Sequence, residues 1–125
     1  MILRVVFLTA CAVASAQTIV NRSDQKPGSD SVVLREDSRT GGMELIATYP
    51  GGHQFAPHSH RSNERIVLLE GKLSLQLKGA EKSLEPGGYA FLPAGEVQRM
   101  KCESQSRCVF YVSWDGDPKS VPAPE

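Results

Sequence analysis

Apolar and polar residues alternate along this chain with the period of two that characterises β-strands, and no stretch follows the helical period. The clearest case is residues 72–78, where leucine occupies every second position. One face of this strand is therefore expected in the core and the other in solvent. Residues 43–49 alternate more weakly. Residues 65–69 are apolar on both faces, which predicts that one face is buried against the core and the other against a second sheet or a subunit.

Glycine and proline divide these strands at short intervals. Such breaks occur at residues 50–52, 70–71, 86–88 and 93–95. Short strands separated by turns every 8–12 residues are typical of an all-β sandwich or barrel. At 125 residues the chain is long enough for one domain of this kind.

Composition divides the chain into three regions, and the net charge gives no indication of a nucleic-acid partner. The formal net charge is zero, so nothing indicates nucleic acid as a partner. Residues 17–42 are polar with two short apolar runs and are interpreted as an N-terminal arm with edge strands. Residues 43–114 hold the regular strands of the barrel. Residues 115–125, with three prolines, are expected to form a flexible tail.

The first 16 residues have the features of an export signal. Arg4 supplies the positive charge, residues 5–14 are apolar and small, and Ala14-Ser15-Ala16 has the form of a signal-peptidase site. Cleavage after residue 16 would place the mature protein in the periplasm or outside the cell, with no membrane attachment. Two alternatives are a buried N-terminal element and a lipid anchor at Cys11.

Two of the three cysteines, Cys102 and Cys108, flank a polar run that is expected to form a hairpin loop. In an exported protein such a pair can close a disulfide across the hairpin. The default expectation is a pair of reduced, half-buried cysteines.

The residues with the clearest chemistry are His58, His60 and Glu64. Side chains two apart on a strand share a face, and the three-residue gap before Glu64 allows a turn that returns the carboxylate to the same point. Two imidazoles and a carboxylate form a facial set that binds a divalent metal and leaves positions open for a ligand. The alternative is a hydrogen-bonded histidine pair in a metal-free barrel.

The spacing around these residues resembles the first signature of the cupin superfamily, G-x5-H-x-H-x3-E-x6-G, which begins at Gly52 and ends at Gly71. The resemblance implies a small single-domain cupin, that is, an all-β double-stranded β-helix (jelly-roll) barrel. It also implies one divalent transition metal inside the barrel mouth and a homodimer.

The second cupin signature, G-x5-P-x-G-x2-H-x3-N, is only partly present. Gly87, Pro93 and Gly95 match, but Gln98 takes the histidine position and Cys102 the asparagine position. An amide oxygen is harder than an imidazole nitrogen, so manganese or iron is favoured over nickel or zinc. Three roles of Gln98 remain open: direct ligation, a hydrogen bond to a metal-bound water, or a degenerate, empty site.

The metal set expected from the resemblance is therefore His58, His60, Glu64 and Gln98, and no catalytic residue is assigned. Strand parity and aromatic character suggest the following pocket residues: Phe55, Leu75, Tyr89, Phe91, Met100, Cys102 and Phe110. Cupins include dioxygenases, isomerases and lyases, so the resemblance implies binding or conversion of a small organic molecule without selecting the reaction. A non-catalytic binding or sensory module is the alternative, and a structural barrel whose metal site has decayed is a third hypothesis.

Overall fold

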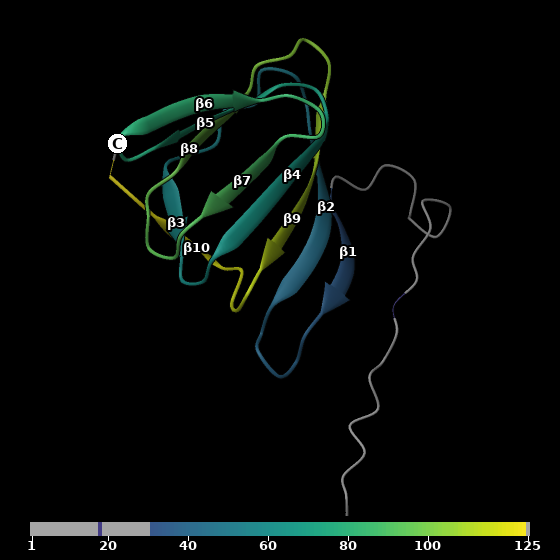
Figure 1. Cartoon of the computed structure of the whole chain (residues 1–125), viewed down its shortest axis with the longest axis vertical. Coiled ribbons are helices and arrows are strands. Elements are labelled where there is room, and N and C mark those ends of the chain that lie inside the picture. The colour runs from purple at the N-terminus through teal and green to yellow at the C-terminus, as the bar shows by residue number, and fades with distance from the viewer. Residues whose placement is uncertain (1–17, 19–30, 125) are drawn as a thin grey trace, which may run out of the picture.

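The computed structural model describes residue 18 and residues 31–124, which form an all-β barrel (Figure 1). Within these residues there are ten strands in three antiparallel sheets and no helix. None of the described segments is therefore a helix that could cross a membrane. The expected signal peptide, the lipid-anchor position Cys11 and all of residues 17–30 except Thr18 lie outside the described residues.

The larger layer is a five-stranded sheet with the order β1-β2-β9-β4-β7. Its bounds are β1 (Ser31–Glu36), β2 (Met43–Tyr49), β4 (Glu64–Glu70), β7 (Tyr89–Leu92) and β9 (Cys108–Trp114). The strand expected at residues 43–49 is present with these bounds. The edge strand expected in the N-terminal arm is β1, which pairs with β2.

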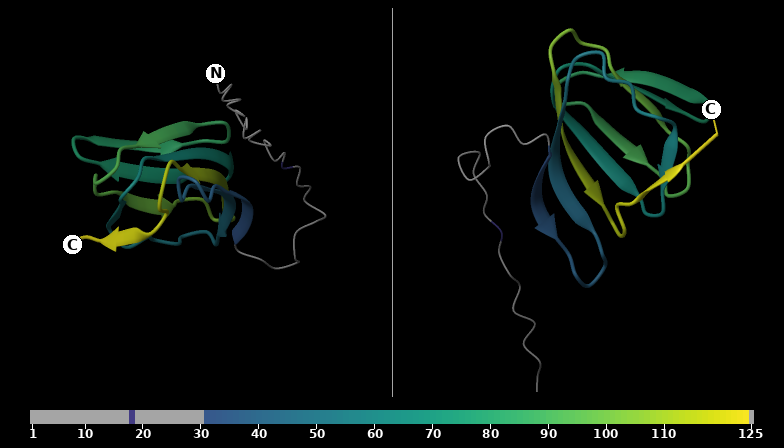
Figure 2. Two further views of the ribbon diagram at one scale, coloured as in Figure 1. Left: turned by 90° about the horizontal axis from the view of Figure 1, so that it is seen from below. Right: turned by 180° about the vertical axis from the view of Figure 1, so that it is seen from behind.

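The opposite layer consists of two smaller sheets, as the two views in Figure 2 show. The first has the order β6-β5-β8, and the second pairs β10 with β3. The bounds are β3 (His58–His60), β5 (Leu73–Leu77), β6 (Ala80–Leu84), β8 (Arg99–Cys102) and β10 (Ser120–Pro122). Backbone bonds between the loop before β3 and β8, such as Phe55 N to Met100 O at 3.0 Å, join the two sheets.

Alternate residues of both layers meet in one core. Leu73 and Leu75 of β5 are buried as their alternation predicts, while Ser74 is half-buried and Gln76 is exposed. The remaining core is supplied mainly by the larger sheet and includes Ala47, Ile66, Leu68, Leu92, Phe110 and Val112. The core therefore lies between the two layers of the barrel.

One face of β4 is buried in the core as predicted, and within the described residues no second sheet covers the other face. Ile66 and Leu68 are fully buried, but Leu69 is 50% exposed. The physical reason is that, within the described residues, the outer face of the five-stranded sheet has no second layer. The registers place Val67 beside Tyr111 on one side and beside Tyr89 on the other, so apolar and aromatic side chains follow one another across this outer face.

The two cysteines form a disulfide, contrary to the default expectation of reduced thiols. Cys102 and Cys108 are both fully buried, with a Cα–Cα distance of 5.9 Å. Glycine is required at the neighbouring turn, because a Cβ at Gly71 would lie 2.7 Å from the Arg107 carbonyl oxygen and 2.9 Å from the Cys108 Sγ, and its φ is +91°. The hairpin loop is thus held closely against the end of the barrel.

The expectation of a flexible tail is also corrected by the structure. The last described residues contain β10, which pairs antiparallel with β3. The prolines of this segment predict disorder, but Pro122 lies opposite His58 in the ladder. Proline is tolerated at such an edge, where its missing N–H faces away from the partner strand.

Candidate metal site and cavity

Strand β3 places His58 and His60 on one face, because residues two apart on a strand project to the same side. Their rings lie 5.0 Å apart, centroid to centroid, and are nearly perpendicular. His58 and Gln98 exchange backbone hydrogen bonds in both directions, at 3.2 and 2.8 Å. Residues paired in this way project to the same face, so Gln98 joins the two histidines.

Both imidazoles are held through Nδ1. The Nδ1 of His58 donates to the carbonyl oxygen of Ala56 at 2.8 Å, and the Nδ1 of His60 donates to that of Pro118 at 2.9 Å. A carbonyl oxygen can only accept, so the proton lies on Nδ1 in both rings. Nε2 is then the nitrogen left for a ligand, an arrangement that metal-binding histidines share.

Glu64 begins β4 and reaches the same point. Its Oε2 lies 2.9 Å from Nε2 of His60, and both side chains are buried. Burial alone would lower the pKa of His60, but the hydrogen bond and charge of Glu64, together with the Pro118 carbonyl, raise that pKa above its usual value. His60 therefore has an acceptor at each nitrogen, which favours the imidazolium while Glu64 is its partner.

Gln98 supplies an oxygen without a partner. The residue is 1% exposed, and its Oε1 has no hydrogen-bond partner among the described residues. A buried acceptor of this kind costs free energy unless a cation, a water or a ligand satisfies it. Two imidazoles with Nδ1 already occupied, one carboxylate and one orphaned amide oxygen are thus a donor set that fits a divalent metal.

The geometry does not bring all of these donors to one point. Among residues 18 and 31–124, no three His, Cys, Asp or Glu side chains are grouped so that they could hold a metal ion. The contact between His60 and Glu64 takes up one imidazole nitrogen and one carboxylate oxygen. Binding of a cation would have to replace that contact.

A cavity of about 530 Å³ opens beside the histidines and Glu64. Its wall is mostly apolar and includes an aromatic cluster. Tyr49 packs against Phe55 and Phe110 at centroid distances of 4.5 and 5.8 Å, and His53 stacks on Tyr49 at 4.8 Å. Its other lining residues include Leu45, Ala47, Met100, Val112, Trp114, Pro118, Ser120 and Pro122.

The pocket residues expected from parity fall into three groups. Phe55, Met100 and Phe110 line the cavity. Leu75 and Cys102 are buried core residues that do not line it. Tyr89 and Phe91 are wrong, because they project from the outer face of β7 and are 56% and 42% exposed. Parity shows which residues share a face, but it does not show which face is the inner one.

Other lining residues were missed by the sequence reasoning. His53, which lies outside both signatures, is half-buried and lines the cavity. Trp114 lies next to His60, with a centroid distance of 5.3 Å, and its buried Nε1 has no hydrogen-bond partner within the described part of the chain. The inward alternation of Phe110, Val112 and Trp114 along β9 was the signal that would have identified this wall.

Comparison with known proteins assigns the family. The sequence profile of the cupin domain matches residues 45–114, and the chain therefore belongs to the cupin family. A DNA damage-repair/toleration protein of Arabidopsis thaliana is 30% identical over 95 residues, which are 74% of this chain and 29% of that protein. Quercetin 2,3-dioxygenase of Bacillus subtilis is 34% identical over 85 residues, which are 65% of this chain and 25% of the enzyme.

A solved structure shows the same fold. The chain is similar to an oxalate oxidase structure, with a TM-score of 0.67 at 18% identity over 92% of this chain and 68% of that chain. This likeness confirms the jelly-roll fold expected from the motifs. The chain spans less than a third of the length of the two sequence relatives above.

Proposed function

We propose that this protein is a metal-dependent cupin that binds and converts a small organic molecule in the cavity beside His58, His60 and Glu64. The observation that carries the proposal is the fixed Nδ1 of both histidines, which turns both Nε2 atoms to the face shared with Gln98; that of His60 contacts Glu64, another proposed ligand. A divalent metal held there by His58, His60, Glu64 and Gln98 would act as a Lewis acid or activate dioxygen. The hard amide oxygen of Gln98 favours manganese or iron.

The cavity wall limits the class of ligand. Among the described residues, its lining contains no lysine, arginine or aspartate, and the carboxylate in it is that of Glu64. The cationic side chain of this wall, the His60 imidazolium, is already paired with Glu64, so a multiply charged anion, such as a phosphate ester, would enter without an uncompensated positive charge to stabilise it. The ligand expected is therefore neutral or singly charged, with an apolar or aromatic body against Tyr49, Phe55 and Phe110 and an oxygen-bearing end near the histidines.

Metal analysis of protein purified without added metal tests the proposal. We expect bound manganese or iron, or a rise in melting temperature when either is added. Turnover of candidate aromatic and carboxylate compounds is then compared under air and under nitrogen, which separates oxygen-dependent from oxygen-independent chemistry. No bound metal and unchanged melting with manganese, iron, nickel and zinc would refute the proposal.

Gln98→His provides a second test of the ligand set. If Gln98 ligates, restoring imidazole at this position shifts metal preference toward nickel or zinc. An unchanged metal preference would instead indicate that Gln98 forms a hydrogen bond to a metal-bound water.

A non-catalytic binding or sensory barrel is the second candidate. It is favoured by the scarcity of spare acid–base groups, because Tyr49 and His53 are the lining residues with ionisable side chains outside the proposed ligand set. Ligand-induced stabilisation without turnover under either atmosphere would support it.

We also propose that the mature protein is exported after cleavage behind residue 16. The buried disulfide between Cys102 and Cys108 supports this, because such bonds persist in oxidising compartments. N-terminal sequencing of the protein recovered from the periplasm or medium tests the cleavage position, and an intact Met1 would contradict it.

A homodimer is proposed as the assembly. The apolar outer face of the larger sheet supports it, with Leu69 50% exposed and Phe91 42% exposed. Light scattering after size-exclusion chromatography measures the mass, and a monomer at micromolar concentration would contradict the proposal.

A further inference from the structure

The C-terminal segment after Trp114 lies outside the region that the cupin profile matches, yet it forms part of the site. In β10, Ser120 lies opposite His60, and Pro122 lies opposite His58. Figure 2 shows β10, in yellow, running beside β3. The strand that carries both histidines therefore has residues 95–98 along one edge and the C-terminal segment along the other.

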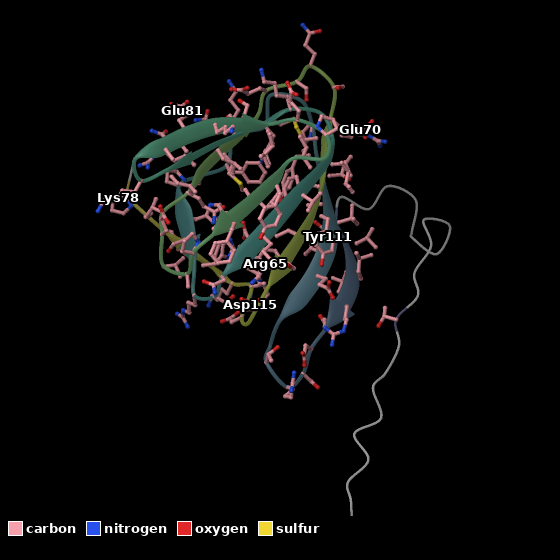
Figure 3. The ribbon with its side chains drawn as sticks, in the orientation of Figure 1. Arg65, Glu70, Lys78, Glu81, Tyr111 and Asp115 are labelled. Atoms are coloured by element: carbon pink, nitrogen blue, oxygen red, sulfur yellow. A yellow bond between two sulfur atoms is a disulfide. The ribbon has the colours of Figure 1, made fainter. Side chains whose placement is uncertain are left out.

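Several contacts hold this segment in place. Asp115 accepts a hydrogen bond from Arg65 Nη1 at 2.6 Å, and its backbone N–H donates to the Asn63 carbonyl at 3.1 Å (Figure 3). The Ser62 hydroxyl donates to the Asp117 carbonyl at 3.0 Å. At the far end, Ala123 N donates to the Pro57 carbonyl at 3.0 Å. The segment is thus tied to the barrel before and after β10.

The two histidines differ in what holds them. The Nδ1 of His58 bonds to Ala56, two residues earlier in the same loop. The Nδ1 of His60 bonds to Pro118, which is 58 residues further along the chain. Pro118, Ser120 and Pro122 also line the cavity. The orientation of His60 consequently depends on the C-terminal segment, and that of His58 does not.

We propose that residues 117–122 are a positioning element of the site, in which the Pro118 carbonyl accepts the hydrogen bond of His60 Nδ1 and so fixes the ring with Nε2 directed at Glu64 and the proposed metal position. A backbone acceptor at this place orients the ring through the fold and needs no particular side chain. The effect on a bound metal rests on the proposed function, whereas the effect on the His60 proton does not.

Nuclear magnetic resonance of the histidine ring N–H groups tests the proposal in the metal-free protein. In the wild type, slowly exchanging Nδ1 protons are expected for both His58 and His60. In a chain ending at Asp117, which lacks Pro118, the His60 signal is expected to disappear and the His58 signal to persist. His58 thus reports that β3 is still folded.

A pair of full-length variants covers the case in which the shortened chain does not fold. Val121→Pro removes the backbone donor opposite Ser59, and Val121→Ala keeps it. The His60 Nδ1 proton is expected to exchange at least about tenfold faster in Val121→Pro and at the wild-type rate in Val121→Ala. Unchanged His60 exchange in Val121→Pro, and in the shortened chain if it folds, would overturn the proposal.

Binding of Mn²⁺ supplies a further readout. Loss of the Pro118 carbonyl is expected to weaken Mn²⁺ affinity by about 10- to 100-fold, the usual effect of removing an outer partner of a ligating histidine. If the wild type binds no metal, the proposed function fails while the proton measurement still decides this inference. Equal Mn²⁺ affinity of the wild type and the folded shortened chain would contradict the positioning role.

Discussion

Glu64 and Glu70 occupy the two ends of β4, and each carboxylate lies 2.9 Å from a cationic partner. Glu64 pairs with His60 inside the barrel, where the two side chains are 3% and 7% exposed. Glu70 pairs with Arg107 at the surface, where both side chains are about half exposed. The same contact distance therefore has different energetic consequences at the two ends of one strand.

Glu64→Ala is expected to destabilise the metal-free protein by about 3 kcal/mol, because removal of one partner leaves a buried group of the other uncompensated. Glu70→Ala is the matched control and is expected to cost less than about 1 kcal/mol, as exposed pairs do. Urea unfolding in the presence of a chelator measures both. Equal losses would show that the buried pair is not held as described.

Gln98→Leu separates a ligand from a structural residue. Since Oε1 of Gln98 has no partner, its removal is expected to leave the unfolding free energy of the metal-free protein unchanged or to raise it by up to about 1 kcal/mol. Mn²⁺ affinity, measured by calorimetry, is expected to fall. Gln54→Leu, at an exposed position of the loop before β3, serves as the control with unchanged Mn²⁺ affinity. A large loss of stability with unchanged Mn²⁺ affinity would show that Gln98 has a structural role and is not a ligand.

Replacement of both Cys102 and Cys108 by alanine is expected to lower the unfolding free energy by about 2 kcal/mol. The estimate follows from the entropy of closing a short loop in the unfolded chain, here with a sequence separation of 6. Dithiothreitol is expected to destabilise the wild type by a similar amount and to have no effect on the double variant. A thiol titration of the native protein that finds both cysteines free would refute the disulfide.

The outer face of the sheet carries a group that titrates at high pH. The Tyr111 hydroxyl donates to Glu44, and burial together with that carboxylate raises the pKa of Tyr111 above its usual value (Figure 3). The pKa of Tyr111 is higher in the folded state than in the unfolded state, where it is about 10. The stability that the neutral hydroxyl contributes is therefore fully present below about pH 10 and is lost as the pH rises through the folded-state pKa.

Tyr111→Phe is accordingly expected to cost about 1 kcal/mol at neutral pH, and the difference from the wild type should shrink above pH of about 10. Urea unfolding at both pH values measures the effect. Tyr89→Phe, at a position 56% exposed, is the control for tyrosine ionisation in general. A difference between wild type and Tyr111→Phe that stays constant with pH would contradict the raised pKa.

Local patterns predicted the parts of the fold that depend on neighbours in sequence. The alternation at residues 43–49 and 72–78 predicted strands that the structure shows as β2 and β5. The signature from Gly52 to Gly71 identified the family and the strand that carries the histidines. Such predictions succeed because side-chain period and turn geometry are properties of a few consecutive residues.

The pocket predictions failed where the answer depended on a partner far along the chain. Tyr89 and Phe91 have the same alternation as inward residues, and only the pairing of β7 with β4 places them outside. The tail is expected to be flexible from its composition, because it contains three prolines. Its order comes instead from backbone pairing with β3, which composition does not report.

By itself the sequence determined the class of fold, the cupin family and the position of His58, His60 and Glu64. Each of these can be predicted from the spacing of residues within a short segment. Tertiary structure alone decided that Gln98 faces His58 with an unpaired oxygen, that Cys102 meets Cys108, and that Pro118 holds His60. These contacts join residues from separate strands, and their formation depends on the long-range pairing of the barrel rather than on any local preference.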